Sequence, residues 1–203
     1  MTNPLPALRH ERLRRLAEAL RERPGTLAND EGDPARAAVA IVLRVAATEP
    51  ELLLIVRAER EGDPWSGQVA LPGGRWSAAD ATLQDTALRE TLEETAVDVG
   101  RDGVVLGTLD ELRPDTPLLP PIIVTPYVCI VRPDVSIAVS DELSMAFWVP
   151  MDSVIDPVHR TESDVTARGR TWRVPAFVVG RHVVWGMTER ILANLHEVVR
   201  KAD

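Results

Sequence analysis

The hydrophobic residues of this chain recur with two different periods, and each period predicts a different kind of element. Three segments carry apolar residues at helical spacing among charged residues, which predicts amphipathic helices. They are residues 8–23, 83–97 and 189–199. Short apolar runs predict buried strands. They are residues 37–44, 52–57, 67–71, 104–112, 122–131 and 146–149. The chain therefore has enough strands for a sheet and helices to cover it.

The helix predicted at 83–97 is the strongest, because its first residues are also marked. Thr82 and Asp85 stand three residues apart, as in a capping box that satisfies the first N–H groups of a helix. Gly100 is expected to end the helix. One apolar stripe, the usual core-facing side of a surface helix, consists of Leu88, Leu92 and Ala96.

The C-terminal third predicts a short helix near 152–154 and then a hairpin. The hairpin joins residues 171–179 to residues 182–185, with Gly180 and Arg181 at the turn. Strands on both sides of one acidic helix, with a second helix at the end, predict an α/β sandwich.

Residues 1–33 are predicted to form an accessory helix and linker, and residues 34–203 the main domain. Pro24 and Gly25 stop the first helix, and a polar linker follows. We expect this helix to pack on the outside of the domain with its basic stripe toward solvent. Contact of the stripe with a membrane or a partner is the alternative.

The charge balance and the cysteine content narrow the class of protein. A formal net charge of −8 argues against a nucleic-acid backbone as the main partner, because phosphate binding usually leaves a basic surface. The single cysteine, Cys129, lies in an apolar run, which predicts a buried, inert thiol. The N-terminus lacks the apolar centre of a signal peptide, and no apolar run approaches the roughly 20 residues that span a bilayer. We therefore expect a cytoplasmic enzyme without a membrane or nucleic-acid partner.

The candidate chemistry lies in a glycine pair, Gly73 and Gly74, and in the acidic helix that follows. This helix carries carboxylates at i, i+3 and i+4: Glu90, Glu93 and Glu94. Such spacing places them on one helical face, where they repel each other unless a cation lies among them. Mg²⁺ prefers oxygen ligands and often shares them with substrate phosphates. The segment predicts a metal-dependent reaction on a phosphorylated substrate; the alternative is an exposed helix with an Arg89 ion pair.

This segment resembles the signature of the Nudix hydrolases, which hydrolyse nucleoside diphosphates linked to another group. The signature positions are occupied by Gly74, Asp80, Arg89, Glu90, Glu93 and Glu94. The first acid is Asp instead of Glu, the spacer before Arg89 is one residue longer than usual, and Ala96 replaces the late glycine. The resemblance implies an α/β/α sandwich with a mixed central sheet and the signature helix beside it. It also implies a pyrophosphohydrolase that uses Mg²⁺ or Mn²⁺.

Asp80 and the longer spacer are similar to the coenzyme A pyrophosphatase branch of that family. Residues 67–74 resemble the Gly-Gln and Phe-Pro-Gly-Gly motif of the branch, with Leu71 in place of Phe, and residues 185–188 resemble its Trp-Gly-x-Thr end. These features imply coenzyme A or acyl-coenzyme A as substrate. Residues 57–66 match the branch less closely, which favours ADP-ribose, NADH, a nucleotide sugar or a dinucleoside polyphosphate. A nucleotide-binding Nudix fold without turnover is a third hypothesis, which the intact glutamates disfavour.

The resemblance also implies a metal site. Glycines at the turn allow a main-chain carbonyl to approach the ion, and that carbonyl would belong to Gly74. Glu90 and Glu94, one helical turn apart, would bind Mg²⁺ or Mn²⁺ with water completing the coordination. Glu93 would ligate a further ion or contact a metal-bound water.

Catalytic roles follow for the neighbouring charges. Arg89 would hold a glutamate by a charge-assisted hydrogen bond. The general base would be Glu142, in the loop before the strand at 146–149, or Glu93. Glu142 is equally explained as a solvated loop charge.

Substrate contacts are predicted from arginines and tryptophans near the signature. Arg57, Arg60 and Arg75 are candidates for binding the phosphates. Trp65 and Trp76 are candidates for stacking on adenine, with packing as the alternative. The expected partner is a small nucleotide substrate, and a homodimer is compatible with the resemblance because dimers are common in that family.

Overall fold

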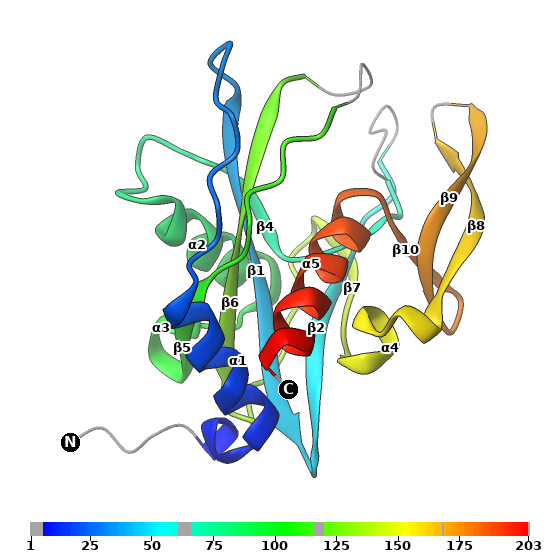
Figure 1. Cartoon of the computed structure of the whole chain (residues 1–203). Helices are drawn as coiled ribbons and strands as arrows, with labels where there is room; N and C mark the ends of the chain where they lie inside the picture. Colours follow the sequence, from blue (N-terminus) through cyan, green and yellow to red (C-terminus); the bar gives the residue numbers. More distant parts are fainter. Residues whose placement is uncertain (1–5, 61–65, 116–119, 168, 203) are drawn as a thin grey trace.

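A computed structural model describes residues 6–60, 66–115, 120–167 and 169–202. Within these residues, the centre of the molecule is a twisted seven-stranded sheet (Figure 1). Its strands are β1 (Ala35–Ala46), β2 (Glu49–Arg57), β3 (Val69–Ala70), β4 (Gly73–Arg75), β5 (Gly103–Thr108), β6 (Ile122–Val131) and β7 (Leu143–Pro150). The order is β3-β2-β1-β6-β5, with β4 paired to β1 and β7 paired to β2. Because β1 and β6 run parallel and the other pairs antiparallel, the sheet is mixed, as predicted.

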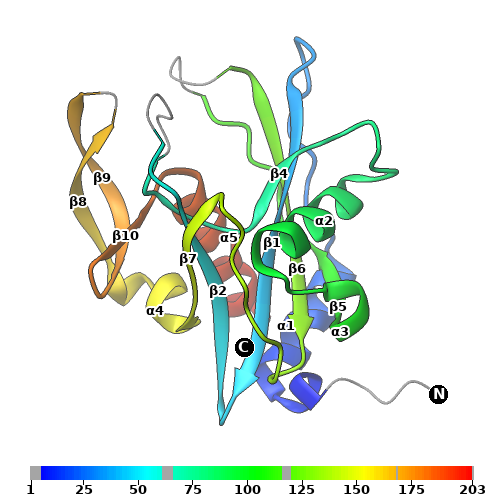
Figure 2. The same cartoon turned by 180° about the vertical axis from the view of Figure 1, so that it is seen from behind.

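Helices cover both faces of this sheet, as Figures 1 and 2 show from opposite sides. One face carries α1 (Glu11–Glu22) and α5 (Gly186–Ala202), and the other carries α2 (Leu83–Thr95) and α3 (Val99–Asp102). In β1, Ile41 and Leu43 join the core on the α1 and α5 side, whereas Ala40 and Val42 join the core beneath α2. A strand buried on both faces has an unbroken apolar sequence. The predicted α/β/α sandwich is confirmed.

A three-stranded sheet stands beside the main one (Figure 1). It contains β8 (Arg160–Ala167), β9 (Arg170–Val179) and β10 (His182–Trp185). The predicted hairpin of β9 and β10, with Gly180 and Arg181 at its turn, is confirmed. The short helix α4 (Asp152–Ile155) is also confirmed, and a 3₁₀ turn, η2 (Pro157–His159), leads into the sheet. The sequence does not predict β8, because most of its residues are polar and exposed.

Only the N-terminal end of α2 agrees with the prediction. The capping box of Thr82 and Asp85 is present. The helix stops at residue 95 and does not continue to Gly100, because Ala96 adopts the left-handed conformation with φ of 58°. Glycine avoids the steric cost of this conformation, which an alanine side chain incurs.

The predicted apolar stripe of α2 is only partly correct, because Leu88 packs against the core while Leu92 is 44% exposed and Ala96 is exposed as well. The buried side is instead small and polar, and consists of Thr86, Ala87, Thr91, Glu94 and Thr95. These residues let α2 lie against β1 and β4. As a result, part of the acidic face is turned inward toward the glycine pair.

Several strand and helix boundaries also differ from the predictions. The strand predicted at 67–71 contracts to β3, and the glycine pair itself forms β4. The strand predicted at 104–112 ends at Thr108, with a single bridge from Leu112 to Val124 beyond it. The last helix begins at Gly186, three residues before its predicted start.

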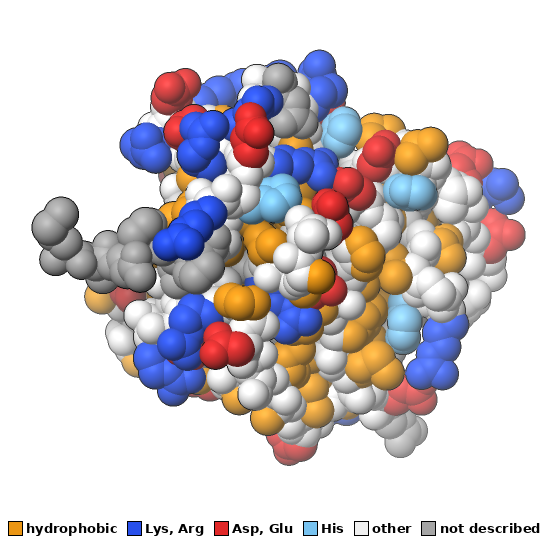
Figure 3. All heavy atoms as spheres, turned by 90° about the horizontal axis from the view of Figure 1, so that it is seen from below, with side chains coloured by type: hydrophobic (Ala, Val, Ile, Leu, Met, Phe, Trp, Pro, Cys, Tyr) orange, Lys and Arg blue, Asp and Glu red, His pale blue; other side chains and the backbone are white. Residues whose placement is uncertain are grey.

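The N-terminal segment adds to the outer layer on the α5 side. A 3₁₀ turn, η1 (Pro6–Arg9), precedes α1, which buries Leu13, Leu16 and Leu20 in the same core as the main sheet. Arginines of α1 pair with acids, for example Arg14 with Glu18 at 2.8 Å, and basic and acidic side chains are interspersed on the face seen in Figure 3. The domain division at residue 33 stays a prediction. Among the described residues, no helix is long and apolar enough to span a membrane.

Candidate active site

The glycine pair brings β4 into close contact with both β1 and α2. A Cβ atom on Gly73, whose φ is 152°, would lie 2.4 Å from the carbonyl oxygen of Ala38. A Cβ atom on Gly74 would lie 2.4 Å from the carboxyl group of Glu90. At Gly73 the neighbouring atoms are backbone, so only a residue without a side chain permits this approach, whereas at Gly74 a side chain would displace the carboxyl group of Glu90. The backbone N–H of Gly73 also donates to Glu94 at 3.0 Å, so two glutamates of α2 meet the turn.

Asp80 and Arg89 form the centre of a charged network beside the turn. The buried carboxylate of Asp80 accepts two hydrogen bonds from Arg89, at 2.8 and 2.9 Å, and one from Thr86 at 2.9 Å. Arg89 reaches Glu90 and Glu93 with its remaining nitrogen, at 2.9 Å each. The Arg89 hydrogen bonds hold the pKa of Asp80 well below its usual range, and Asp80 in turn raises the pKa of Arg89. Asp80 therefore holds the Arg89 guanidinium in place, and Arg89 in turn orients Glu90 and Glu93.

Glu94 is in a different electrostatic state from Asp80. Its side chain is buried, and burial raises its pKa to about 7, with further raising by the charges of Glu90 and Glu142. The Gly73 N–H and the charge of Arg57 oppose this shift without cancelling it. A cation placed near such a buried carboxylate would stabilise its ionised form.

The turn and α2 together offer oxygen ligands for a divalent ion. The candidate donors are the carboxylates of Glu90 and Glu94 and the backbone of Gly74, which lies directly against the Glu90 carboxyl group. Glu93 is 58% exposed and held by Arg89. Within the described part of the chain, no three acidic or histidine side chains are gathered as a preformed metal site. Two carboxylates with backbone oxygen and water suit Mg²⁺ or Mn²⁺, which retain several waters.

The loop before β7 carries Glu142 to this end of α2. The Ser140 N–H donates to the backbone oxygen of Glu94 at 3.1 Å, and the Ala58 N–H donates to the backbone oxygen of Glu142 at 2.9 Å. The Glu142 side chain is exposed, yet its charge contributes to the raised pKa of Glu94. Tertiary structure thus unites acids that are 48 residues apart in the chain.

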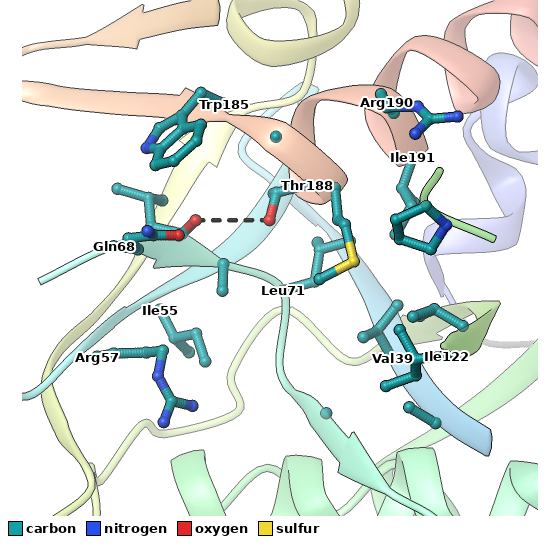
Figure 4. Close-up of a pocket in the computed structure, with 18 of the residues that line it drawn as sticks. Val39, Ile55, Arg57, Gln68, Leu71, Ile122, Trp185, Thr188, Arg190 and Ile191 are labelled. Atoms are coloured by element: carbon teal, nitrogen blue, oxygen red, sulfur yellow. Dashed lines mark hydrogen bonds between the residues drawn. The ribbon is translucent and has the colours of Figure 1, made fainter. Parts of the chain in front are cut away.

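A cleft of about 880 Å³ opens from the glycine turn (Figure 4). Gly73, Gly74 and Glu94 lie in its lining, together with Arg57. Most of the remaining lining is apolar and comes from both sheets and α5: Val39, Ile55, Leu71, Ile122, Val124, Val174, Trp185, Met187 and Ile191. The acidic end therefore continues into an apolar channel.

The predicted phosphate-binding arginines divide into two groups. Arg57 and Arg75 line the cleft. Among the described residues, Arg60 does not contribute to this lining, and its guanidinium donates to the backbone oxygen of Asp141 at 3.3 Å. Two further arginines that no sequence motif marked, Arg170 and Arg190, line the cleft from β9 and α5. The alternation of residues along β9 could be seen in the sequence, but the position of β9 beside the cleft could not.

The other singled-out side chains are less central. Trp76 is 49% exposed, and its indole N–H donates to the backbone oxygen of Asp80 at 3.3 Å. Trp65 lies outside the described residues. Cys129 is fully buried, as expected, and burial raises the pKa of its thiol to about 12, which makes it a poor nucleophile.

Comparisons with known proteins extend this description. The sequence profile of the NUDIX domain matches residues 34–169. A Salmonella paratyphi B protein described as "Uncharacterized Nudix hydrolase NudL" is 35% identical over 161 residues, which cover 79% of this chain and 81% of that protein. A MutT/nudix family protein from Enterococcus faecalis is similar with a TM-score of 0.58 and 19% identity, over 85% of this chain and 65% of that one. The C. elegans Ap4A hydrolase, solved as a binary complex, is similar with a TM-score of 0.52 and 15% identity, over 82% of this chain and 93% of that one. At these identities the two structures show a shared fold alone.

Proposed function

This chain belongs to the Nudix hydrolase family and is a pyrophosphohydrolase, and we propose that its substrate is coenzyme A or an acyl-coenzyme A. Hydrolysis of the diphosphate would release a phosphopantetheine, acylated or not, and adenosine 3′,5′-bisphosphate. The observation that carries this proposal is the continuity of the cleft. Its acidic end, at Glu94 and the glycine turn, opens directly into an apolar channel.

The channel suits the pantetheine arm better than a sugar. Side chains such as Val39, Leu71 and Ile122 offer hydrophobic contact along the cleft, and contact of this kind favours methyl, methylene and acyl groups. A sugar hydroxyl placed there would need polar partners to replace its water. The volume of about 880 Å³ also falls within the usual range for a site that encloses a sizeable ligand.

We assign the metal site to Glu90, Glu94 and the backbone carbonyl of Gly74, with Glu93 at its exposed edge. Nudix hydrolases generally use divalent metal ions. A bound Mg²⁺ or Mn²⁺ would supply charge neutralisation at the phosphate oxygens and a water of lowered pKa. The raised pKa of Glu94 supports the assignment, because its buried carboxylate lacks enough positive charge nearby to stay ionised at its usual pH.

We assign Glu142 as the general base that accepts a proton from the attacking water. Glu93 is the alternative, but its carboxylate is held by Arg89 at 2.9 Å. Glu142 is exposed and lies close enough for its charge to act on Glu94. Arg89 acts as a positioning residue, because it holds Glu90 while itself held by Asp80.

We assign Arg57 and Arg75 to the diphosphate, because both line the cleft beside the glycine turn. Arg60 remains a third candidate. Its bond to the Asp141 backbone also supports the loop that carries Glu142, so it can act on the base as well as on substrate.

A product analysis tests the proposal. The purified protein is incubated with Mg²⁺ or Mn²⁺ and a panel of coenzyme A, acetyl-coenzyme A, ADP-ribose, NADH, a nucleotide sugar and a dinucleoside tetraphosphate, and products are identified by mass spectrometry. We expect adenosine 3′,5′-bisphosphate from coenzyme A or its acyl ester, with kcat/KM at least about tenfold above the other compounds. Cleavage of ADP-ribose with coenzyme A untouched would contradict the substrate assignment.

A further inference from the structure

One wall of the cleft is built by the C-terminal part of the chain. Here "C-terminal wall" means the cleft-lining residues of β9, β10 and α5. They are Arg170, Trp172, Val174, Trp185, Gly186, Met187, Thr188, Arg190 and Ile191. All of them lie beyond residue 169, where the match to the NUDIX domain ends. The C-terminal wall can therefore determine which substrate this family member accepts.

Two arginines on this wall, Arg170 and Arg190, have no acidic partner among the residues that the structure describes. On β9, Arg173 is paired with Glu162 at 2.8 Å, whereas Arg170 has no ion pair within the described residues. On α5, the buried acid Glu189 is taken by Arg160 at 2.7 Å.

Arg190, the next residue of α5, also has no ion pair within the described part of the chain. A guanidinium that has no carboxylate and faces a ligand cleft is suited to bind an anionic group, in particular a phosphate.

The alternation of β9 places Arg170 with an aromatic side chain. Residues two apart on a strand share a face, and Arg170, Trp172 and Val174 all line the cleft while Arg173 pairs on the outside. Trp172 is 42% exposed, so its ring is available for a planar ligand group.

The arginines of the C-terminal wall are also separate from those assigned to the diphosphate. Figure 4 shows Arg57 and Arg190 on opposite sides of the cleft. Arg57 acts on Glu94, at the acidic end. The cleft therefore has positive charge at two places.

We propose that Arg170 and Arg190 bind a second phosphate of the substrate, the 3′-phosphate of the adenosine in coenzyme A, while Trp172 contacts the adenine. This inference rests on the proposed function, because it names the part of the substrate that the C-terminal wall recognises. The wall then makes the enzyme select coenzyme A over 3′-dephospho-coenzyme A, which has the same diphosphate and the same pantetheine arm.

The test compares these two substrates in the unaltered protein and in the double variant R170Q/R190Q. The unaltered protein should have a KM for coenzyme A at least about tenfold below its KM for 3′-dephospho-coenzyme A. In the double variant the KM for coenzyme A should rise to the level of the dephospho compound, with kcat changed less than about twofold. The matched control is R173Q/R200Q, which removes one arginine from the same strand and one from the same helix, both already paired with acids outside the cleft. The control should retain the preference.

The outcomes separate this inference from the proposed function. Equal KM values for the two substrates in the unaltered protein, or an equal rise for both in the double variant, would overturn the role of the two arginines while leaving coenzyme A as substrate. If the protein hydrolyses neither compound, titration with adenosine 3′,5′-bisphosphate and with AMP decides. Tighter binding of the bisphosphate, lost in R170Q/R190Q and kept in R173Q/R200Q, supports the second phosphate site. Equal binding of the two nucleotides rejects it.

Discussion

Charged side chains are arranged in opposite ways on the two walls of the cleft. On the signature side, one network joins Asp80, Arg89, Glu90 and Glu93, so that each side chain is held by another. On the C-terminal side, Arg170 and Arg190 have no acidic partner within the described residues and stand among apolar groups. The first wall lies within the match to the NUDIX domain and the second lies beyond it. The difference indicates that fixed geometry for the reaction and open charge for recognition are located on separate parts of the chain.

The largest expected effect comes from removing a carboxylate of the signature wall. Glu90→Gln should lower kcat/KM by about 10³-fold or more, because loss of a metal ligand removes several kcal/mol of transition-state stabilisation. Steady-state kinetics over a range of Mg²⁺ concentrations measures this effect. Glu162→Gln, on the outer sheet, is the control and should leave the rate unchanged. A Glu90→Gln enzyme with near-normal activity would mean that the metal site lies elsewhere.

Glu94 should make the metal-free protein less stable as the pH rises. Its pKa is about 7 in the folded chain and 4.5 ordinarily, so between these values the folded state holds more protons than the unfolded state. Stability then falls with rising pH, and the loss of about 3 kcal/mol is complete above pH 7.

Urea unfolding of the protein and of Glu94→Gln, with a chelator present, measures this effect. The free-energy difference between the two should grow in favour of the variant from pH 4.5 to pH 7, and Mg²⁺ should reverse it. A pH-independent difference would show that burial does not disfavour the Glu94 charge.

Asp80 should contribute to stability more than the paired charges of the outer sheet. Asp80→Asn removes the partner of Arg89 and should lower the free energy of unfolding more than the loss of an exposed ion pair does. Glu162→Gln breaks the exposed pair with Arg173 and should cost less than about 0.5 kcal/mol. Chemical denaturation of both variants makes the comparison. Equal losses of stability in the two variants would show that the Asp80 network is no more stabilising than an exposed ion pair.

A smaller effect on rate is expected from the general base. Glu142→Gln should lower kcat at least about tenfold with little change in metal affinity, because proton removal is impaired while the ligands remain. Single-turnover kinetics and a metal titration separate the two quantities. A near-normal rate would transfer the role to Glu93.

The smallest effect concerns the end of α2. Ala96→Gly should raise stability by up to about 1 kcal/mol, because the left-handed conformation costs alanine about that amount. The gain is limited because glycine also has more freedom to lose on folding. Thermal unfolding measures the shift, with Ala19→Gly in α1 as a control that should be destabilising. A destabilised Ala96→Gly protein would indicate that the methyl group makes favourable contacts.

The central strands and the capping box of α2 could be predicted from sequence because their signals are local. Apolar runs such as those of β1 and β6 indicate strands buried on two faces, and Thr82 with Asp85 indicates the start of a helix. The buried side of α2 could not be predicted this way. Its periodicity suggested Leu92, but close packing against a strand of small residues selected the side with Ala87 and Glu94.

By itself, the sequence determined the family, the α/β/α class and the acidic face that follows the glycine pair, because spacing along one helix and a turn are properties of neighbouring residues. Only the tertiary structure decided which of those acids is buried, which loop brings Glu142 to them, and which arginines complete the cleft. Burial and long-range charge arise from segments far apart in the chain, so no local pattern records them. The two walls therefore differ in what sequence alone reveals: the motif of the first was visible, whereas the second became a wall only when β9 and α5 were placed beside the sheet.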